Sequence, residues 1–136
     1  MNKNMTYKDM NNIKGGLRRA FARSDHYQKV KAKYRVEHFD PKHPRCSKWS
    51  YCAVCGVVTP DWRTTLDHID PLVPVNSHFE DIPINESINR LWCEESNLQN
   101  ICDACHYVKS RLEAEMRKPY KKPRNKSNKP RRKRNK

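Results

Sequence analysis

Apolar positions near the N-terminal end of the chain recur with a helical period. Tyr27, Val30 and Tyr34 follow one another at spacings of three and four residues, so they share one face of a helix. Ser24 stands just before them and is a suitable N-cap, because its side-chain oxygen can accept a hydrogen bond from a free backbone N–H. The pattern predicts a basic helical arm over residues 17–36.

Short β-prone runs and proline-rich connectors alternate in the middle of the chain. Residues 64–69 (TTLDHI) and 98–101 (LQNI) predict two strands. Residues 38–50 contain two prolines and predict a connector, and residues 70–83 contain three prolines and predict a long loop. Residues 1–14 are mostly polar and are expected to be loosely ordered.

Two further segments have helical spacing. The stretch INESINRLWC, residues 84–93, carries isoleucine, isoleucine and leucine on one face and predicts a packed helix. Residues 103–118 predict a second helix, which Pro119 ends because proline cannot continue the backbone hydrogen bonding. Together with the two strands, these helices predict a small α+β fold. The apolar positions of the second helix fall on one side: Ala104, Val108 and Leu112.

Basic side chains outnumber acidic ones, and the excess is concentrated at the C-terminal end. The chain of 136 residues has a formal net charge of +14, and twelve lysines and arginines fall in residues 117–136, which contain no acid. A segment of that composition cannot bury a core and is expected to be disordered when free. The charge favours a polyanionic partner, most often nucleic acid, over a polybasic contact with a membrane surface.

The shifts in composition predict three parts. Residues 1–48 are expected to form the basic N-terminal arm and connector, residues 49–118 the folded domain, and residues 119–136 the polybasic tail. Only 35% of the residues are apolar, and a core that thin usually needs a further stabilising element such as a structural metal. No long apolar run and no apolar N-terminal segment marks the chain as membrane-spanning or secreted.

Four of the six cysteines form two Cys-x-x-Cys pairs. Cys52 and Cys55 make the first pair, and Cys102 and Cys105 make the second. Without a secretion signal, paired cysteines favour metal binding over disulfides, and four thiolates make a closed tetrahedral zinc site. Gly56 suits the tight turn of a zinc knuckle. The sequence therefore predicts a structural zinc, with a folded insert between the knuckles.

The two remaining cysteines are given other roles. Cys46 lies six residues before the first pair and is the alternative zinc ligand, although the paired cysteines are preferred. Cys93 follows a tryptophan on the predicted helix and is interpreted as a small buried apolar residue.

A second constellation of polar residues lies in and after the insert. Asp67 and His68 are adjacent, Asn97 precedes the second strand, and His106 follows the last knuckle cysteine directly. Adjacent residues on a strand point to opposite faces, but they can serve one site where the strand twists at its end. An imidazole exchanges protons near neutral pH, and a carboxylate with an imidazole can bind a divalent cation.

At these residues the sequence resembles the HNH endonucleases. The matching segments are YCAVCG, LDHIDP and NLQNICDACH, with Lys109 three residues after the last histidine. The wider likeness is to the free-standing HNH proteins of bacteriophages, which often carry segments similar to LRRAF, FEDIP and RLWCEESNLQ. The resemblance covers roughly residues 15–117 and leaves the basic tail outside.

The resemblance implies a ββα-metal finger, here inserted between the two zinc knuckles, and a role for each matching residue. His68 would be the general base. Asp67 and His106 would bind the catalytic metal, which could be Mg²⁺, Mn²⁺ or Ni²⁺, and His106 would thereby take part in catalysis. Asn97 would fix the loop that orients the base, and Lys109 would steady a phosphate.

The resemblance and the charge together imply a metal-dependent nuclease that cleaves DNA, of the phage or homing type. It is expected to act as a monomer or weak homodimer in the cytoplasm, inside a phage-infected bacterium. The alternative is a non-catalytic zinc finger that binds DNA or RNA through the same cysteines and basic regions. The basic residues expected to contact nucleic acid are Arg18, Arg19, Arg23, Lys29, Lys33, Lys109, Arg131 and Arg132.

Overall fold

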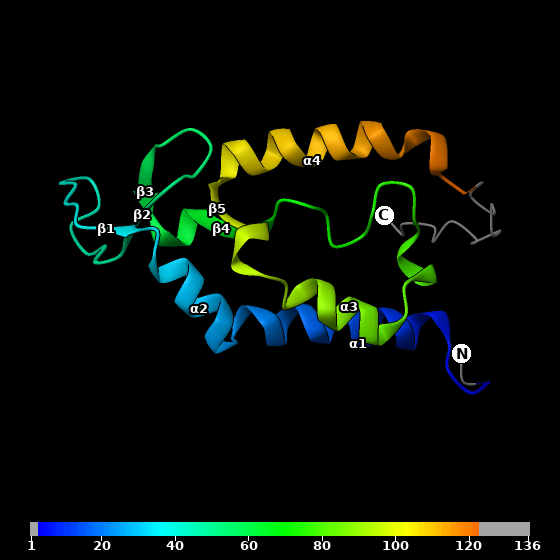
Figure 1. The fold of residues 1–136 in the computed structure, drawn as a ribbon. Helices are drawn as coiled ribbons and strands as arrows, with labels where there is room; N and C mark the ends of the chain where they lie inside the picture. The colour runs from blue at the N-terminus through cyan, green and yellow to red at the C-terminus, as the bar shows by residue number, and fades with distance from the viewer. Residues whose placement is uncertain (1–2, 123–136) are drawn as a thin grey trace, which may run out of the picture.

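The computed structural model describes residues 3–122 as a small α+β fold with four α-helices and two antiparallel sheets (Figure 1). Most of the predicted tail, including Arg131 and Arg132, lies outside the described residues. No helix within residues 3–122 is long and apolar enough to cross a membrane. The helices are α1 (Tyr7–Ala22), α2 (Asp25–Ala32), α3 (Ile84–Leu91) and α4 (Asp103–Arg117).

The N-terminal arm is two helices and begins earlier than predicted. Residues expected to be loosely ordered are helical from Tyr7, because Thr6 and Asp9 form a capping box in which each side chain bonds the other's backbone N–H. The predicted cap at Ser24 is confirmed, since its Oγ accepts from the Tyr27 N–H at 3.2 Å. This cap starts α2 and divides the predicted single helix into two.

The three-stranded sheet was missed by the sequence patterns. It consists of β1 (Arg35–Val36), β2 (Trp49–Tyr51) and β3 (Val58–Pro60), paired antiparallel in that order. The predicted connector therefore leads into β2, and the end of the predicted helical arm is β1. Strands of two and three residues are too short to show an alternating pattern.

The two predicted strands form the other sheet, and the predicted helix follows directly. β4 (Thr64–His68) and β5 (Leu98–Cys102) pair antiparallel, with Thr64 opposite Cys102 and His68 opposite Leu98. α4 starts at the next residue after β5 and packs along both strands. α4 therefore starts next to Thr64 and runs back along β4, so that Lys109 reaches the carbonyl of His68 at the end of the strand.

One core joins the N-terminal helices to this two-stranded sheet. Its buried members are Phe21 of α1, Val30 of α2, Leu66 of β4, Leu91 of α3 and Leu98 of β5. The cluster therefore combines side chains from both sides of the expected boundary between residues 48 and 49. A second, smaller cluster surrounds the paired cysteines.

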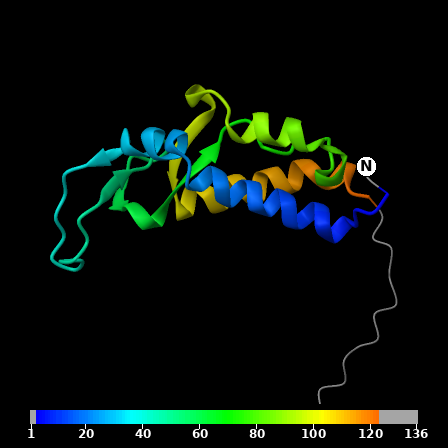
Figure 2. The same ribbon diagram turned by 90° about the horizontal axis from the view of Figure 1, so that it is seen from below.

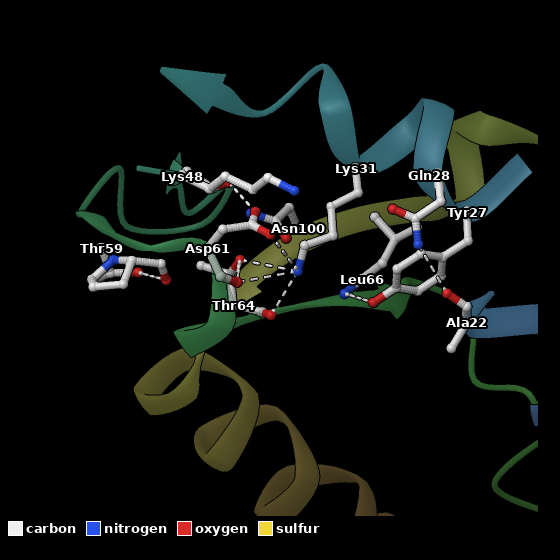
Figure 3. Close-up of polar contacts among 12 residues, drawn as sticks. Ala22, Tyr27, Gln28, Lys31, Lys48, Thr59, Asp61, Thr64, Leu66 and Asn100 are labelled. Atoms are coloured by element: carbon white, nitrogen blue, oxygen red, sulfur yellow. Dashed lines mark hydrogen bonds and ion pairs between the residues drawn. The ribbon is translucent and has the colours of Figure 1, made fainter. Parts of the chain in front are cut away.

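A buried lysine connects α2 to the start of β4 (Figure 3). Lys31 Nζ donates to the backbone oxygens of Thr64 at 2.8 Å and Asp61 at 3.3 Å, and the Asp61 carboxylate lies 3.9 Å away. Burial lowers the pKa of Lys31, and the Asp61 carboxylate counters part of that shift. These bonds satisfy carbonyl groups at the strand end and help to orient β4 against α2.

The apolar side of α4 predicted from its sequence faces solvent. Val108 and Leu112 are 56% and 60% exposed, and no residue of α4 is fully buried. The side that faces the rest of the protein carries the partly buried residues Cys105, Lys109, Glu113 and Arg117. Figure 1 shows α4 along one side of the molecule and α1 with α3 along the other, and Figure 2 gives the perpendicular view.

Candidate functional site

Four cysteines meet where the two sheets adjoin. Cys52 and Cys55 come from the turn after β2, Cys102 ends β5, and Cys105 lies in the first turn of α4. Their four sulfur atoms all lie within 4.8 Å of one another, so the group could hold a metal ion such as zinc. Gly56 closes the first turn with φ of +75°, a conformation that disfavours other residues.

The backbone around the cluster favours the thiolate form of Cys52. Burial raises the pKa of Cys52, but N–H groups of Cys55, Cys102 and Val54 lower it to about 6. Two effects raise the pKa of Cys105 to about 12: the larger is hydrogen bonding with the Cys102 thiol, and the next is burial. Of these two thiols, Cys52 has the lower pKa and therefore loses its proton before Cys105. Cysteine binds a metal as the thiolate. Metal bound to this cluster should therefore be released as the pH falls.

The other two cysteines lie outside this cluster. Cys46 donates to the Lys48 carbonyl at 3.2 Å, and Cys93 packs partly buried against the main core. Neither belongs to the group of sulfurs that could hold a metal. The assignment of the two Cys-x-x-Cys pairs to one cluster is therefore confirmed.

A cleft of about 800 Å³, lined by several charged side chains, opens between α1, β4 and α4. The loop from residue 70 to residue 83 forms part of its wall. Arg117 of α4 donates to the Val73 carbonyl at 2.5 Å, and buried Lys14 of α1 donates to the Phe79 carbonyl, so both helices hold this loop. The cleft brings together side chains far apart in sequence: Arg18, Asp67, His68, His106, Lys109 and Glu113.

His68 lies at the end of β4 and is held by two other elements. Its Nε2 lies 3.0 Å from the Leu91 carbonyl of α3, and its ring packs on Phe21 of α1 with centroids 5.4 Å apart. Because the carbonyl only accepts hydrogen bonds, this contact gives Nε2 the hydrogen and leaves the Nδ1 lone pair free. The patterns did not reveal that α1 and α3 orient this histidine.

Asn97 lies outside the cleft but fixes the turn after His68. It belongs to a short 3₁₀ turn, η3 (Glu95–Asn97), next to β5. Its Oδ1 accepts from the Asp70 N–H at 2.8 Å, and its backbone oxygen accepts from the Ile69 N–H at 2.9 Å. These two bonds hold the backbone immediately after His68, which is the arrangement expected of a loop-fixing residue.

Asp67 takes part in a charged network that crosses from β4 to α4. Lys109 Nζ lies 3.1 Å from Asp67 Oδ2 and 2.5 Å from Glu113 Oε1, and it donates to the His68 carbonyl at 2.9 Å. Partial burial lowers the pKa of Lys109, but the bonds to Glu113 and Asp67 outweigh this and raise it. The sequence patterns did not single out Glu113. Its position four residues after Lys109 on a helix does predict an ion pair between the two side chains.

His106 is exposed in the first turns of α4 and lines the same cleft as Asp67. Within residues 3–122, the four cysteines are the one group of three or more His, Cys, Asp or Glu residues at ligand spacing. Asp67 and His106 line one cleft, and they carry an oxygen and a nitrogen donor of the kinds that divalent cations accept.

The basic residues expected to contact nucleic acid have different surroundings. Arg18 lies over the Phe79 ring, 5.6 Å from its centroid, at the edge of the cleft. Lys33 pairs with Glu95 at 2.5 Å, whereas Arg23 and Lys29 are exposed and have no bonded partner for their side chains within residues 3–122. Free cations of this kind are the better candidates for phosphate contacts.

Comparisons of the chain with protein-family models, with curated proteins and with solved structures found no match.

Proposed function

We propose that this protein is a metal-dependent endonuclease of the HNH type that hydrolyses DNA phosphodiester bonds. One observation carries the proposal: Asp67, His68 and His106, which the motifs single out, line a single cleft between α1, β4 and α4. Two antiparallel strands followed by a helix are the elements of a ββα-metal finger. The resemblance of the motifs to HNH endonucleases gives these residues their proposed roles.

His68 is the proposed general base. Its Nε2 is engaged by the Leu91 carbonyl, so Nδ1 would take the proton from an attacking water. The contact with Phe21 limits rotation of the ring, and Asn97 limits movement of the backbone that follows. A general base held in one orientation loses less entropy when the reacting groups come together.

Asp67 and His106 would hold the catalytic divalent metal. When bound, such an ion supplies charge stabilisation for the phosphate and the departing oxygen. Mixed oxygen and nitrogen ligands suit Mg²⁺, Mn²⁺ or Ni²⁺. The four cysteines would hold zinc in a closed site with no position for water, so its role would be to stabilise the fold.

Two lysines near α2 provide a matched test of DNA contact. Lys29 is exposed without a bonded partner within residues 3–122, whereas Lys33 is already paired with Glu95. We expect Lys29→Ala to weaken DNA binding and to lower the log–log salt slope by about 0.9, the value for one phosphate contact. Lys33→Ala should change the slope much less. Fluorescence anisotropy over a salt series measures both, and equal slopes for Lys29→Ala and the natural protein would contradict the assignment.

The test of the nuclease proposal is metal-dependent cleavage of DNA. Zinc-loaded protein is incubated with supercoiled plasmid alone, with Mg²⁺, and with Mn²⁺. The proposal predicts nicked or linear product only when a second divalent ion is added, while the zinc content stays constant. Plasmid that stays supercoiled with every ion, although the protein binds it, would contradict the proposal.

A second candidate is a non-catalytic zinc-dependent protein that binds DNA or RNA. Two observations favour it. His106 is exposed, and within residues 3–122 no third His, Cys, Asp or Glu completes a group at ligand spacing with Asp67 and His106. This protein would need the four cysteines and the basic surface, but it would not depend on His68.

A further inference from the structure

Lys109 is bonded differently from the other basic residues of the cleft. An ammonium group has three N–H donors. Three protein oxygens surround Lys109 Nζ: the His68 carbonyl at 2.9 Å, Asp67 Oδ2 at 3.1 Å and Glu113 Oε1 at 2.5 Å. Every donor therefore has an acceptor inside the protein, and none is left for a phosphate oxygen.

We propose that Lys109, held by Glu113, is a positioning residue that fixes Asp67 and the end of β4 against α4 and does not contact DNA. The inference rests on the proposed function, which makes Asp67 a ligand of the catalytic metal. It replaces the role expected from the motif alone, in which Lys109 steadies a phosphate.

The hydrogen bonds to Asp67 favour this positioning role. Gln99 of β5 donates to the same carboxylate oxygen, Oδ2, at 3.4 Å. Lys109 and Gln99 thus hold one oxygen from two different elements. The other oxygen, Oδ1, has no hydrogen-bond partner within residues 3–122 and is the one available to a cation. Fixing a carboxylate through its second oxygen is a common way to orient a metal ligand.

Glu113 completes the arrangement because it balances the charge of Lys109. Together, Asp67, Lys109 and Glu113 carry one net negative charge, which attracts a divalent cation to Asp67. Without Glu113, the ammonium would cancel the charge of Asp67 and repel the cation across a few ångströms. Glu113→Gln should therefore weaken Mn²⁺ binding through charge alone. Lys109→Met removes the repelling charge but also releases Asp67 Oδ2, so it should weaken Mn²⁺ binding less than Glu113→Gln does. The double variant restores the net charge without the positioning contacts and should recover part of the affinity.

The salt dependence of DNA binding tests whether Lys109 contacts phosphate. Lys109→Met is compared with Arg18→Met, which removes the same charge from the opposite wall of the cleft. We expect Arg18→Met to lower the log–log slope by about 0.9 and Lys109→Met to leave it unchanged. A loss of about 0.9 for Lys109→Met would overturn the inference. Lys109→Gln keeps two donors and replaces Lys109→Met in this measurement if the methionine variant fails to fold.

Mn²⁺ binding, followed by electron paramagnetic resonance on zinc-loaded protein, tests the charge balance. We expect at least about a threefold loss of affinity for Glu113→Gln, with partial recovery in the double variant with Lys109→Met, which regains the net charge but lacks the contacts that position Asp67. No loss for Glu113→Gln would count against the role of Glu113. Neither measurement uses cleavage, so the inference and the nuclease proposal can fail separately. If the natural protein binds no Mn²⁺, the proposed metal site is lost, and the salt slope still decides whether Lys109 contacts DNA.

Discussion

Replacing Cys102 by serine is expected to unfold the protein around β5 and α4. Cys102 is 6% exposed, ends β5 and contributes one of the four clustered sulfurs. A structural zinc site contributes about 10 kcal/mol of apparent free energy to small zinc-binding folds, and a whole domain has only about 5–15 kcal/mol of net stability. The hydrophobic clusters of this chain are small, so the loss of the site should exceed what they can supply.

Thermal unfolding followed by circular dichroism, with zinc content measured on the same samples, checks this expectation. The natural protein should lose its cooperative transition when a chelator removes zinc, and Cys102→Ser should lack the transition throughout. Cys46→Ser is the matched control, because Cys46 lies outside the cluster. This variant should retain both its zinc and its cooperative transition. A Cys102→Ser protein that melts like the natural one would show that the cluster is not a stabilising metal site.

Replacing His68 by alanine is expected to lower the rate of DNA cleavage by about 100- to 10,000-fold, the usual contribution of a general base. DNA affinity and zinc content should change little, because His68 contacts neither the cysteine cluster nor Lys29, the exposed lysine of α2. The substitution also removes the contact with Phe21, so some loss of stability is expected, and rates should be measured well below the melting temperature.

His78 provides the matched control for His68. Both histidines line the same cleft, but His78 lies in the three-proline loop of residues 70–83 and has no ring hydrogen bond within residues 3–122. His78→Ala should therefore cleave DNA at nearly the natural rate. Equal losses from the two substitutions would indicate that the cleft requires histidines for its shape or charge and would remove the specific role given to His68.

The pattern of apolar residues predicted β4, β5, α3 and α4 because each is regular over at least five residues. Local patterns do not show which surfaces meet. The contact of Phe21 with His68 joins residues 47 positions apart, and neither residue's surroundings in the sequence point to the other. The same limit explains the apolar side of α4: its spacing predicted a helix correctly but could not show that this side faces solvent.

The candidate site was more predictable than the fold, because its residues stand in short motifs. The two Cys-x-x-Cys pairs predicted their own cluster, since two intervening residues bring both thiols to one point. Glu113 was missed for a different reason: its spacing from Lys109 indicates an ion pair along the helix, but not that the same lysine also meets Asp67 of β4. Only the folded arrangement brings Glu113 and Asp67 to opposite sides of one ammonium group.

The most direct test of the account is the single-turnover rate of nicking by the natural protein and by His68→Ala, with Mn²⁺ present and DNA binding saturated. The account predicts rapid conversion of supercoiled DNA by the natural protein and almost none by the variant, with equal zinc content and equal DNA affinity. Equal rates for the two proteins would contradict the assignment of the base. If both bind DNA equally well and neither cleaves it, the nuclease proposal fails and the zinc-dependent binding protein becomes the better account.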